Sequence, residues 1–224
     1  MSELVDHVIL SLGKANLLQS KITREIKEMG GMTGIKTRHF YNNLCSYKDA
    51  RYFEIGVWTG SSICSAMCNN EMYCLCVDNW SQFQLTQKEQ MILGGSPKDK
   101  FLENFSKFKG KNEAAFIEAD CWKINADEIA KRFKFNIYLF DGEHDEASHF
   151  KSLNHYLPCL EDEFIFLVDD WNMPDAVKGT NKSIETNNFD VIYKKEIFTE
   201  AKDGVGLGHD WWNGIGIFVL RASK

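Results

Sequence analysis

Acidic residues lie at the carboxyl ends of five predicted strands, and their side chains are the best candidates for binding or catalysis in this sequence. The acids in question are Glu54, Asp78, Asp120, Asp141 and the pair Asp169-Asp170. The carboxyl ends of parallel strands meet at one edge of a sheet, where open α/β proteins bind their ligands. We therefore expect these acids to face a single crevice.

A simpler interpretation exists for each acid taken alone. An Asp just before a helix accepts hydrogen bonds from free N–H groups, which explains Asp120 or Asp170 singly as well as a functional role does. Capping does not explain acids after five successive strands, and Glu54 and Asp141 follow apolar strands rather than open helices.

His144 is the candidate general base. It ends the segment Asp141-Gly142-Glu143-His144, immediately before a predicted helix. An imidazole with an unperturbed pKa of about 6.5 can accept a proton at neutral pH. A histidine near a helix N-terminus is not favoured electrostatically, so its presence asks for a reason. The alternative is a residue that only makes local hydrogen bonds.

A glycine-containing turn after the first strand predicts a cofactor site. The segment from Tyr52 to Gly60 is a short apolar strand followed by a tight turn, and a helix begins at once with Ser61. Such a strand–turn–helix is how α/β proteins hold nucleotide-type cofactors. Trp58 occupies the middle position at which a dinucleotide fingerprint has glycine.

The charges around this turn favour a ligand without phosphate. No Lys or Arg occurs between Tyr52 and Gln87, so a pyrophosphate beside the acids would be repelled. S-adenosylmethionine has no phosphate and carries a sulfonium cation, so it suits an acid-lined crevice better. Asp78 lies where a carboxylate can accept hydrogen bonds from both ribose hydroxyls.

Alternating strand and helix patterns predict an α/β fold, a Rossmann-like, seven-stranded, mostly parallel sheet with helices on both faces. The expected strands are residues 51–55, 72–77, 114–118, 135–140, 164–168, 189–198 and 214–220. The expected helices are 61–69, 97–108, 125–133, 145–160 and one within 173–186, while 78–95 is expected to be irregular. The last two strands leave no room for a helix between them, so we expect an antiparallel hairpin joined by the Gly-rich residues 204–208.

The N-terminal part is predicted to be a helical extension. Residues 1–48 are expected to form a cap on the main domain, which would span 49–224. Apolar residues at helical spacing predict one helix over 2–29 and a second over 36–45. Arg38 and His39 are either an exposed pair or a cation within reach of the cofactor's carboxylate.

Composition limits the remaining function classes. The 224 residues carry a formal charge of −6, which argues against a nucleic-acid partner. Seven cysteines, an odd number, suggest reduced thiols in a cytoplasmic protein, and Cys64, Cys68, Cys74 and Cys76 lack the spacing of a zinc site. No membrane span or signal peptide is expected. The sequence leaves the oligomeric state open, a homo-oligomer included.

From Arg51 onward the sequence resembles the class I S-adenosylmethionine-dependent methyltransferases. Glu54-Ile55-Gly56 with Gly60 is similar to their first motif, and the segment 140–144 with Asp169-Asp170 resembles the small-molecule O-methyltransferase branch, which includes macrocin-type and catechol enzymes. The resemblance implies cofactor-binding roles for Glu54, Gly56, Gly60, Ser61, Asp78, Asp120, Cys121 and Asp141, and catalytic roles for His144 and Asp141. It also implies Asp141, Asp169 and Asp170 as ligands of Mg²⁺ where a metal is used.

The expected function is methyl transfer from S-adenosylmethionine to a hydroxyl of a small molecule, with or without Mg²⁺. Aromatic residues in the irregular segments, including Trp80, Phe83, Trp211 and Trp212, are expected to contact a ring-containing or sugar-like acceptor. Two alternatives stay open. One is a nicotinamide-dependent oxidoreductase on a similar sheet, and the other is a non-catalytic module that binds the cofactor.

Overall fold

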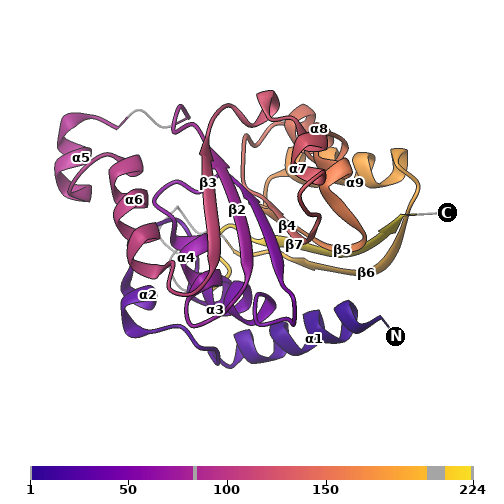
Figure 1. Ribbon diagram of the computed structural model, residues 1–224, viewed down its shortest axis with the longest axis horizontal. Coiled ribbons are helices and arrows are strands. Elements are labelled where there is room, and N and C mark those ends of the chain that lie inside the picture. The colour runs from indigo at the N-terminus through magenta and orange to yellow at the C-terminus, as the bar shows by residue number, and fades with distance from the viewer. Residues whose placement is uncertain (1, 83–84, 201–209, 223–224) are drawn as a thin grey trace.

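A single twisted sheet organises the chain. The computed structural model describes residues 2–82, 85–200 and 210–222. The strands are β1 (Arg51–Ile55), β2 (Tyr73–Asp78), β3 (Glu113–Glu118), β4 (Phe135–Phe140), β5 (Leu160–Asp169), β6 (Phe189–Ile197) and β7 (Ile215–Ala222). They form a seven-stranded sheet in the order β3-β2-β1-β4-β5-β7-β6 (Figure 1). Strands β1 to β5 pair in parallel, and β7 runs antiparallel to both of its neighbours, β5 and β6.

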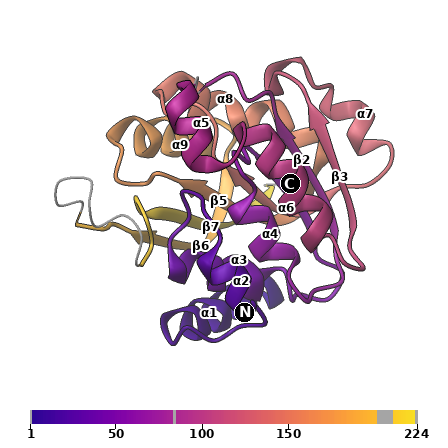
Figure 2. The ribbon, with the colours of Figure 1, turned by 90° about the vertical axis from the view of Figure 1, so that its left-hand side faces the viewer.

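Helices cover both faces of this sheet. They are α1 (Glu3–Asn16), α2 (Arg24–Glu28), α3 (Ile35–Leu44), α4 (Ser61–Met67), α5 (Gln87–Leu93), α6 (Pro97–Phe108), α7 (Ala126–Ala130), α8 (Glu146–Tyr156) and α9 (Pro174–Thr186), with short 3-10 turns at Cys121–Lys123 and Leu157–Cys159. Figure 2 shows α1, α2 and α3 on one side of the sheet and α8 and α9 on the other. Two apolar cores result, one on each face.

Alternation along each strand divides the side chains between these cores. Tyr52 of β1 points into the core beneath α3 and α4, while Phe53 points into the core beneath α8. Phe53 stacks on Phe135 and Tyr138 with ring centroids 4.9 and 5.4 Å apart. The predicted fold class, with its mostly parallel sheet and terminal antiparallel hairpin, is thus confirmed.

Two local predictions are wrong. The helix expected over 2–29 is two helices, because the chain turns at Leu18 with φ +55° and Thr23 then caps α2. The segment 78–95 is not wholly irregular, since it contains α5, which Thr86 and Glu89 start with a reciprocal capping box. The Gly-rich residues 204–208, His209 and Phe83 lie outside the described residues.

The N-terminal helices share a continuous core with the sheet. Val8 of α1 and Phe40 of α3 are fully buried in the cluster that also holds Tyr52. Arg38 and His39 are both buried, at 4% and 1% exposure, so the expectation of an exposed pair is wrong. The division into a cap and a main domain at residue 48 stays a prediction. No helix within the described ranges is long and apolar enough to cross a membrane.

Gly56 allows the ends of β1 and β4 to meet. Its φ is +83°, and a Cβ there would lie 1.8 Å from the backbone oxygen of Asp141. Asp141 N also donates to Ile55 O at 2.8 Å. The turn that follows β1 is therefore packed against the backbone of the first acid after β4.

This packing predicts that Gly56→Ala lowers the free energy of unfolding by about 3 kcal/mol or more, since both the left-handed backbone and the contact oppose a side chain. Denaturant titration measures the effect. Gly13→Ala is the matched control, because Gly13 lies in α1 with nothing within 4 Å, and it should raise stability by about 0.5–1 kcal/mol. Equal effects at the two positions would contradict this account of Gly56.

Candidate active site

A cavity of about 460 Å³ opens at the carboxyl ends of the parallel strands. The sequence-predicted residues that line it are Gly56, Asp78, Asp120, Cys121, Asp141, His144, Asp169 and Asp170. Glu143 adds a sixth acid, while none of the described lining residues is Lys or Arg. The crossover topology explains this gathering, because every strand from β1 to β5 ends at the same edge of the sheet.

Asp78 holds the glycine turn in place. Its Oδ2 accepts hydrogen bonds from the backbone N–H groups of Val57 and Trp58 at 2.8 and 3.0 Å, and its Oδ1 accepts one from Trp80 N at 2.7 Å. Trp80 Nε1 in turn donates to Trp58 O at 2.8 Å. The carboxylate that was expected at a ribose thus also shapes the loop beside it, and Oδ1 can accept a further hydrogen bond.

Glu54, Gly60 and Ser61 do not line the cavity. Glu54 is fully buried behind the turn, where its carboxyl accepts hydrogen bonds from the hydroxyls of Tyr52 and Ser62. Gly60 has φ +87° and starts α4 against the ring of Phe101. These residues support the turn from beneath and are not placed to contact a ligand in the cavity directly.

Three neighbouring carboxyls crowd the floor of the cavity. Burial first, and the nearby Asp169 next, raise the pKa of Asp141 well above its usual range. Burial and the adjacent Asp170 raise the pKa of Asp169 to about 8, and Asp141 and Asp169 share a hydrogen bond. Asp169 Oδ1 is buried and has no hydrogen-bond partner among the described residues. Like charges this close cannot all ionise, so the cluster must hold a proton or a cation.

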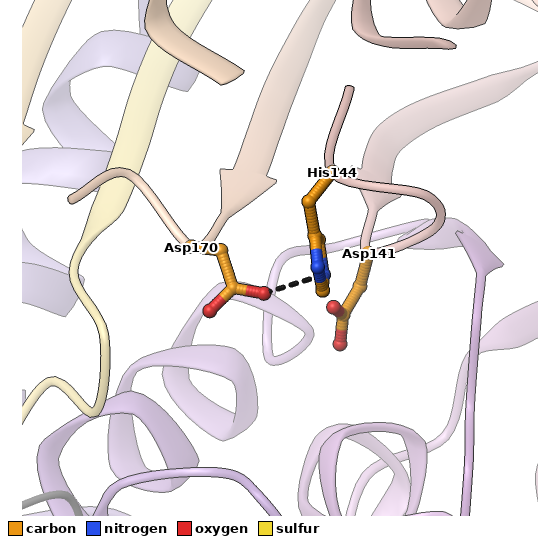
Figure 3. A group of neighbouring side chains, drawn as sticks. All are labelled: Asp141, His144 and Asp170. Atoms are coloured by element: carbon orange, nitrogen blue, oxygen red, sulfur yellow. Dashed lines mark ion pairs between the residues drawn. The ribbon is translucent and has the colours of Figure 1, made fainter. Parts of the chain in front are cut away.

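His144 completes the cluster from the turn after β4. Its Nε2 lies 2.6 Å from Asp170 Oδ2 (Figure 3). Asn213 Nδ2 donates to the other Asp170 oxygen at 2.7 Å. The hydrogen bond to Asp170 raises the pKa of His144 despite partial burial. Burial acts to raise the pKa of Asp170, but the His144 contact outweighs it and leaves that pKa below its usual value. The interpretation of His144 as a residue with only local hydrogen bonds is therefore wrong.

Strained backbone gathers around the same cavity. Trp58, Trp80, Trp212 and Asp170 have φ values of +50°, +51°, +53° and +53°. They make up half of the eight non-glycine residues with positive φ among those described, and all four line the cavity. A bulky residue rarely adopts this conformation, and such outliers concentrate at functional sites.

The helix-capping alternatives resolve differently for two acids. Asp120 does cap the turn at Cys121–Lys123, accepting from Trp122 N at 3.0 Å, while it also lines the cavity. Asp170 caps no helix, since α9 begins later, at Pro174. Asn172, two residues after Asp170, is engaged with Thr199 through both side-chain atoms.

Sequence reasoning missed several residues of the site. Met32, from the loop before α3, lines the cavity, and so does Trp122. Tyr41 of α3 is fully buried without a hydrogen-bond partner for its hydroxyl, and Asp169 is its strongest charged neighbour. The helical pattern around Tyr41 indicated burial, but no local signal placed it beneath the acids.

One group of side chains in the described part of the chain has the spacing to hold a metal ion. Oxygens of Asp141 and Asp170 and a ring nitrogen of His144 lie within 4.8 Å of one another. Asp169, named from the sequence as a ligand, lines the cavity beside them but is not in this group. The cysteines form no such group, and Cys64, Cys68, Cys74 and Cys76 are buried core residues.

Comparison with known proteins identifies the family to which this chain belongs. Residues 53–171, which hold the cavity's strands from β1 to β5, match the description of a methyltransferase domain. No curated protein matches the sequence.

Solved structures supply further examples of the fold. The O-methyltransferase TomG from Streptomyces achromogenes, solved with S-adenosylmethionine, is 10% identical with a TM-score of 0.55, and the match covers 99% of this chain and 100% of that one. PH1948 from Pyrococcus horikoshii, described as a proposed RNA methyltransferase, is 15% identical with a TM-score of 0.51 and full coverage of both chains, 100% each. SMU.776, a proposed methyltransferase solved with S-adenosylhomocysteine, is 12% identical with a TM-score of 0.54 over 86% of this chain. This chain spans about half the length of SMU.776, 50%. At these identities the likeness shows the fold alone.

The buried Glu54 predicts a pH dependence of stability. Burial raises the pKa of Glu54 from 4.5 to about 8. The folded protein then keeps a proton that the unfolded chain releases, so this contribution is complete below pH 4.5 and is lost as the pH rises through 8. In Glu54→Gln, the fall in the free energy of unfolding between pH 5 and pH 8 should be smaller by more than about 1 kcal/mol.

Denaturant titrations across this pH range measure the difference in slope. Asp141 and Asp169 act in the same direction, so the variant should keep part of the dependence. Glu118→Gln, at an exposed acid paired with Lys98, is the matched control and should follow the wild type. An unchanged slope in Glu54→Gln would contradict the raised pKa.

Proposed function

This chain belongs to the family of methyltransferase domains, and from that premise we propose that it transfers the methyl group of S-adenosylmethionine to a hydroxyl oxygen of a small molecule. The observation that carries the proposal is the cavity at the end of the sheet, where six acids and His144 meet without a Lys or Arg among the described lining residues. The similar proteins named above give no support to a nicotinamide-dependent oxidoreductase.

The cavity suits the cofactor in charge and in shape. The sulfonium and ammonium groups of S-adenosylmethionine are cations, which the crowded carboxyls of the floor would stabilise. Asp78, beside the glycine turn, is assigned to the ribose, and Asp120 and Cys121 to the adenine, next to Trp122 in the chain, which also lines the cavity. Gly56 lets the cofactor's methionine part approach the backbone closely. Glu54, Gly60 and Ser61 support this arrangement from behind the turn.

His144 is assigned to remove the acceptor's proton. Methyl transfer to oxygen is an in-line displacement, so the acceptor oxygen must lie next to the methyl group and lose its hydrogen. The Nε2 of His144 bonds to Asp170, which orients the ring and stabilises its protonated form. Because the pKa is raised, the neutral form that can accept a proton becomes more abundant as the pH rises above 6.5.

The floor of the cavity also fits a divalent cation. Asp141, Asp169 and Asp170 are oxygen donors of the kind Mg²⁺ prefers, and the buried Asp169 Oδ1 has no hydrogen-bond partner among the described residues. A bound Mg²⁺ would orient two acceptor oxygens and lower the pKa of a hydroxyl. The contact between His144 and Asp170 means that the base and the cation share one carboxylate.

The acceptor side is assigned to the aromatic wall. Trp58, Trp80 and Trp212 line the cavity with Met32, and each of these tryptophans is held in a strained conformation. Flat apolar walls beside acids suit a small ring-bearing molecule with hydroxyl groups. PH1948 is described as acting on RNA, so an RNA acceptor is an outcome that the assay below must include.

Cofactor binding is the first test. Isothermal calorimetry should detect binding of S-adenosylmethionine and of its demethylated product. In Asp78→Ala, which loses a carboxylate that also holds the glycine turn, affinity should fall by about a hundredfold or more. Asp190→Ala, at an exposed position of β6, is the control that should bind normally. Wild-type protein that bound neither molecule would overturn the proposed function.

Catalysis is the second test. Transfer of a labelled methyl group should be measured on a panel of phenols, sugars and short RNAs, with and without a chelator. His144→Gln should lower kcat by about a hundredfold to ten-thousandfold while leaving cofactor affinity unchanged. His7→Gln removes a histidine that bonds to Leu44 O, away from the cavity, and should leave kcat unaltered. Labelling confined to RNA would redirect the proposal, and cofactor binding without any transfer would favour a non-catalytic module.

A further inference from the structure

Arg38 of α3 is a buried cation without a carboxylate partner among the described residues. It is 4% exposed, and its guanidinium donates only to backbone carbonyls, from Nε to Thr33 O at 2.9 Å and from Nη1 to Ile26 O at 2.6 Å. Removing an unpaired charge from water is energetically costly. A neutral side chain could also donate to two carbonyl groups. The hydrogen bonds alone therefore do not explain why a charged residue is buried here.

The loop that Arg38 holds is fastened to the glycine turn. Thr33 Oγ1 and Ser61 Oγ lie 2.7 Å apart, and Thr59 Oγ1 donates to Gly30 O at 3.2 Å. A side chain on Gly31 would lie 2.4 Å from Ser61 Oγ, so the two segments are in close contact. Met32 of this loop lines the cavity, as Gly56 and Trp58 of the glycine turn also do.

The described lining of the cavity contains no permanently charged cation. The described lining residues include six acids and no Lys or Arg. The methionine part of S-adenosylmethionine carries a carboxylate as well as an ammonium group, and that carboxylate would be repelled by the floor. Burial lowers the pKa of Arg38 to about 10, which still leaves it charged at neutral pH.

Resting on the proposed function, we infer that Arg38 is a positioning residue that provides the counter-charge for the cofactor's carboxylate and holds the Thr33 loop at the methionine end of the cavity. The N-terminal helices would then complete the cofactor site, although they lie outside the matched residues 53–171. In a poorly solvated interior a charge acts over several ångströms, so no direct contact is needed.

A pair of ligands tests this inference. Decarboxylated S-adenosylmethionine keeps the adenosine, the sulfonium and the amine and lacks only the carboxylate. Calorimetry should show that Arg38→Gln lowers the affinity for S-adenosylmethionine on the order of tenfold. The same variant should bind the decarboxylated molecule within about twofold of the wild type, since the lost interaction has no partner in that ligand.

Two further variants separate charge from structure. Arg38→Lys keeps the charge and should retain more of the preference for the carboxylated ligand than Arg38→Gln does. Thr33→Val breaks the hydroxyl contact with Ser61 and should weaken both ligands equally. An equal loss of both ligands in Arg38→Gln, or no loss, would overturn the inference while leaving the proposed function intact. Wild-type protein that bound neither ligand would overturn both.

Discussion

Carboxylates gathered at one edge of a parallel sheet repel one another, and the surrounding structure must reduce this repulsion. Strands β2 to β5 deliver their acids to the same cavity, and three of these acids show different means of support. Asp78 accepts three backbone N–H groups, Asp170 pairs with His144, and Asp169 has its pKa raised by burial. What remains is a floor that binds cations well and anions badly, which restricts the ligands that the cavity can accept.

The supports of this floor come from outside the strands. Asn213, which precedes β7, donates a hydrogen bond to Asp170, and Met32 from the N-terminal part of the chain lines the cavity. Lys36 N donates to Asp210 O at 2.9 Å, which joins the start of α3 to the loop that carries Trp212. Segments from the N-terminal and C-terminal parts of the chain therefore contact each other, and both contribute residues to the cavity lining. Trp212 and Asp170, with positive φ, lie among these residues.

Electrostatics also links the N-terminal helices to the proposed cofactor site. A cavity lined with acids needs a positive charge if its ligand has both signs, and the buried Arg38 is a cation that the lining itself lacks. The same guanidinium bonds to the loop that carries Met32. Arg38 thus joins α3 to a loop whose Met32 lines the cavity.

The sequence by itself determined the fold class and most of the residues of the cavity. Strands and helices could be predicted because their hydrophobic periodicities depend only on the local order of side chains. The acids could be assigned to one site because the carboxyl ends of parallel strands lie at the same edge of the sheet. The helix 97–108 and the strand 135–140 were predicted to the residue, because a proline start and a mostly apolar run are strong local signals.

Only the tertiary structure decided which acid does what. Glu54 has the same local signal as Asp78, yet it lies behind the turn because the alternation of β1 directs it into the core with Tyr52. The pairing of His144 with Asp170 joins residues from two loops, and Asp170 was equally well placed in sequence to cap a helix. Arg38 is buried in α3, which packs against α1 and α4, and no local pattern records these contacts between separate helices.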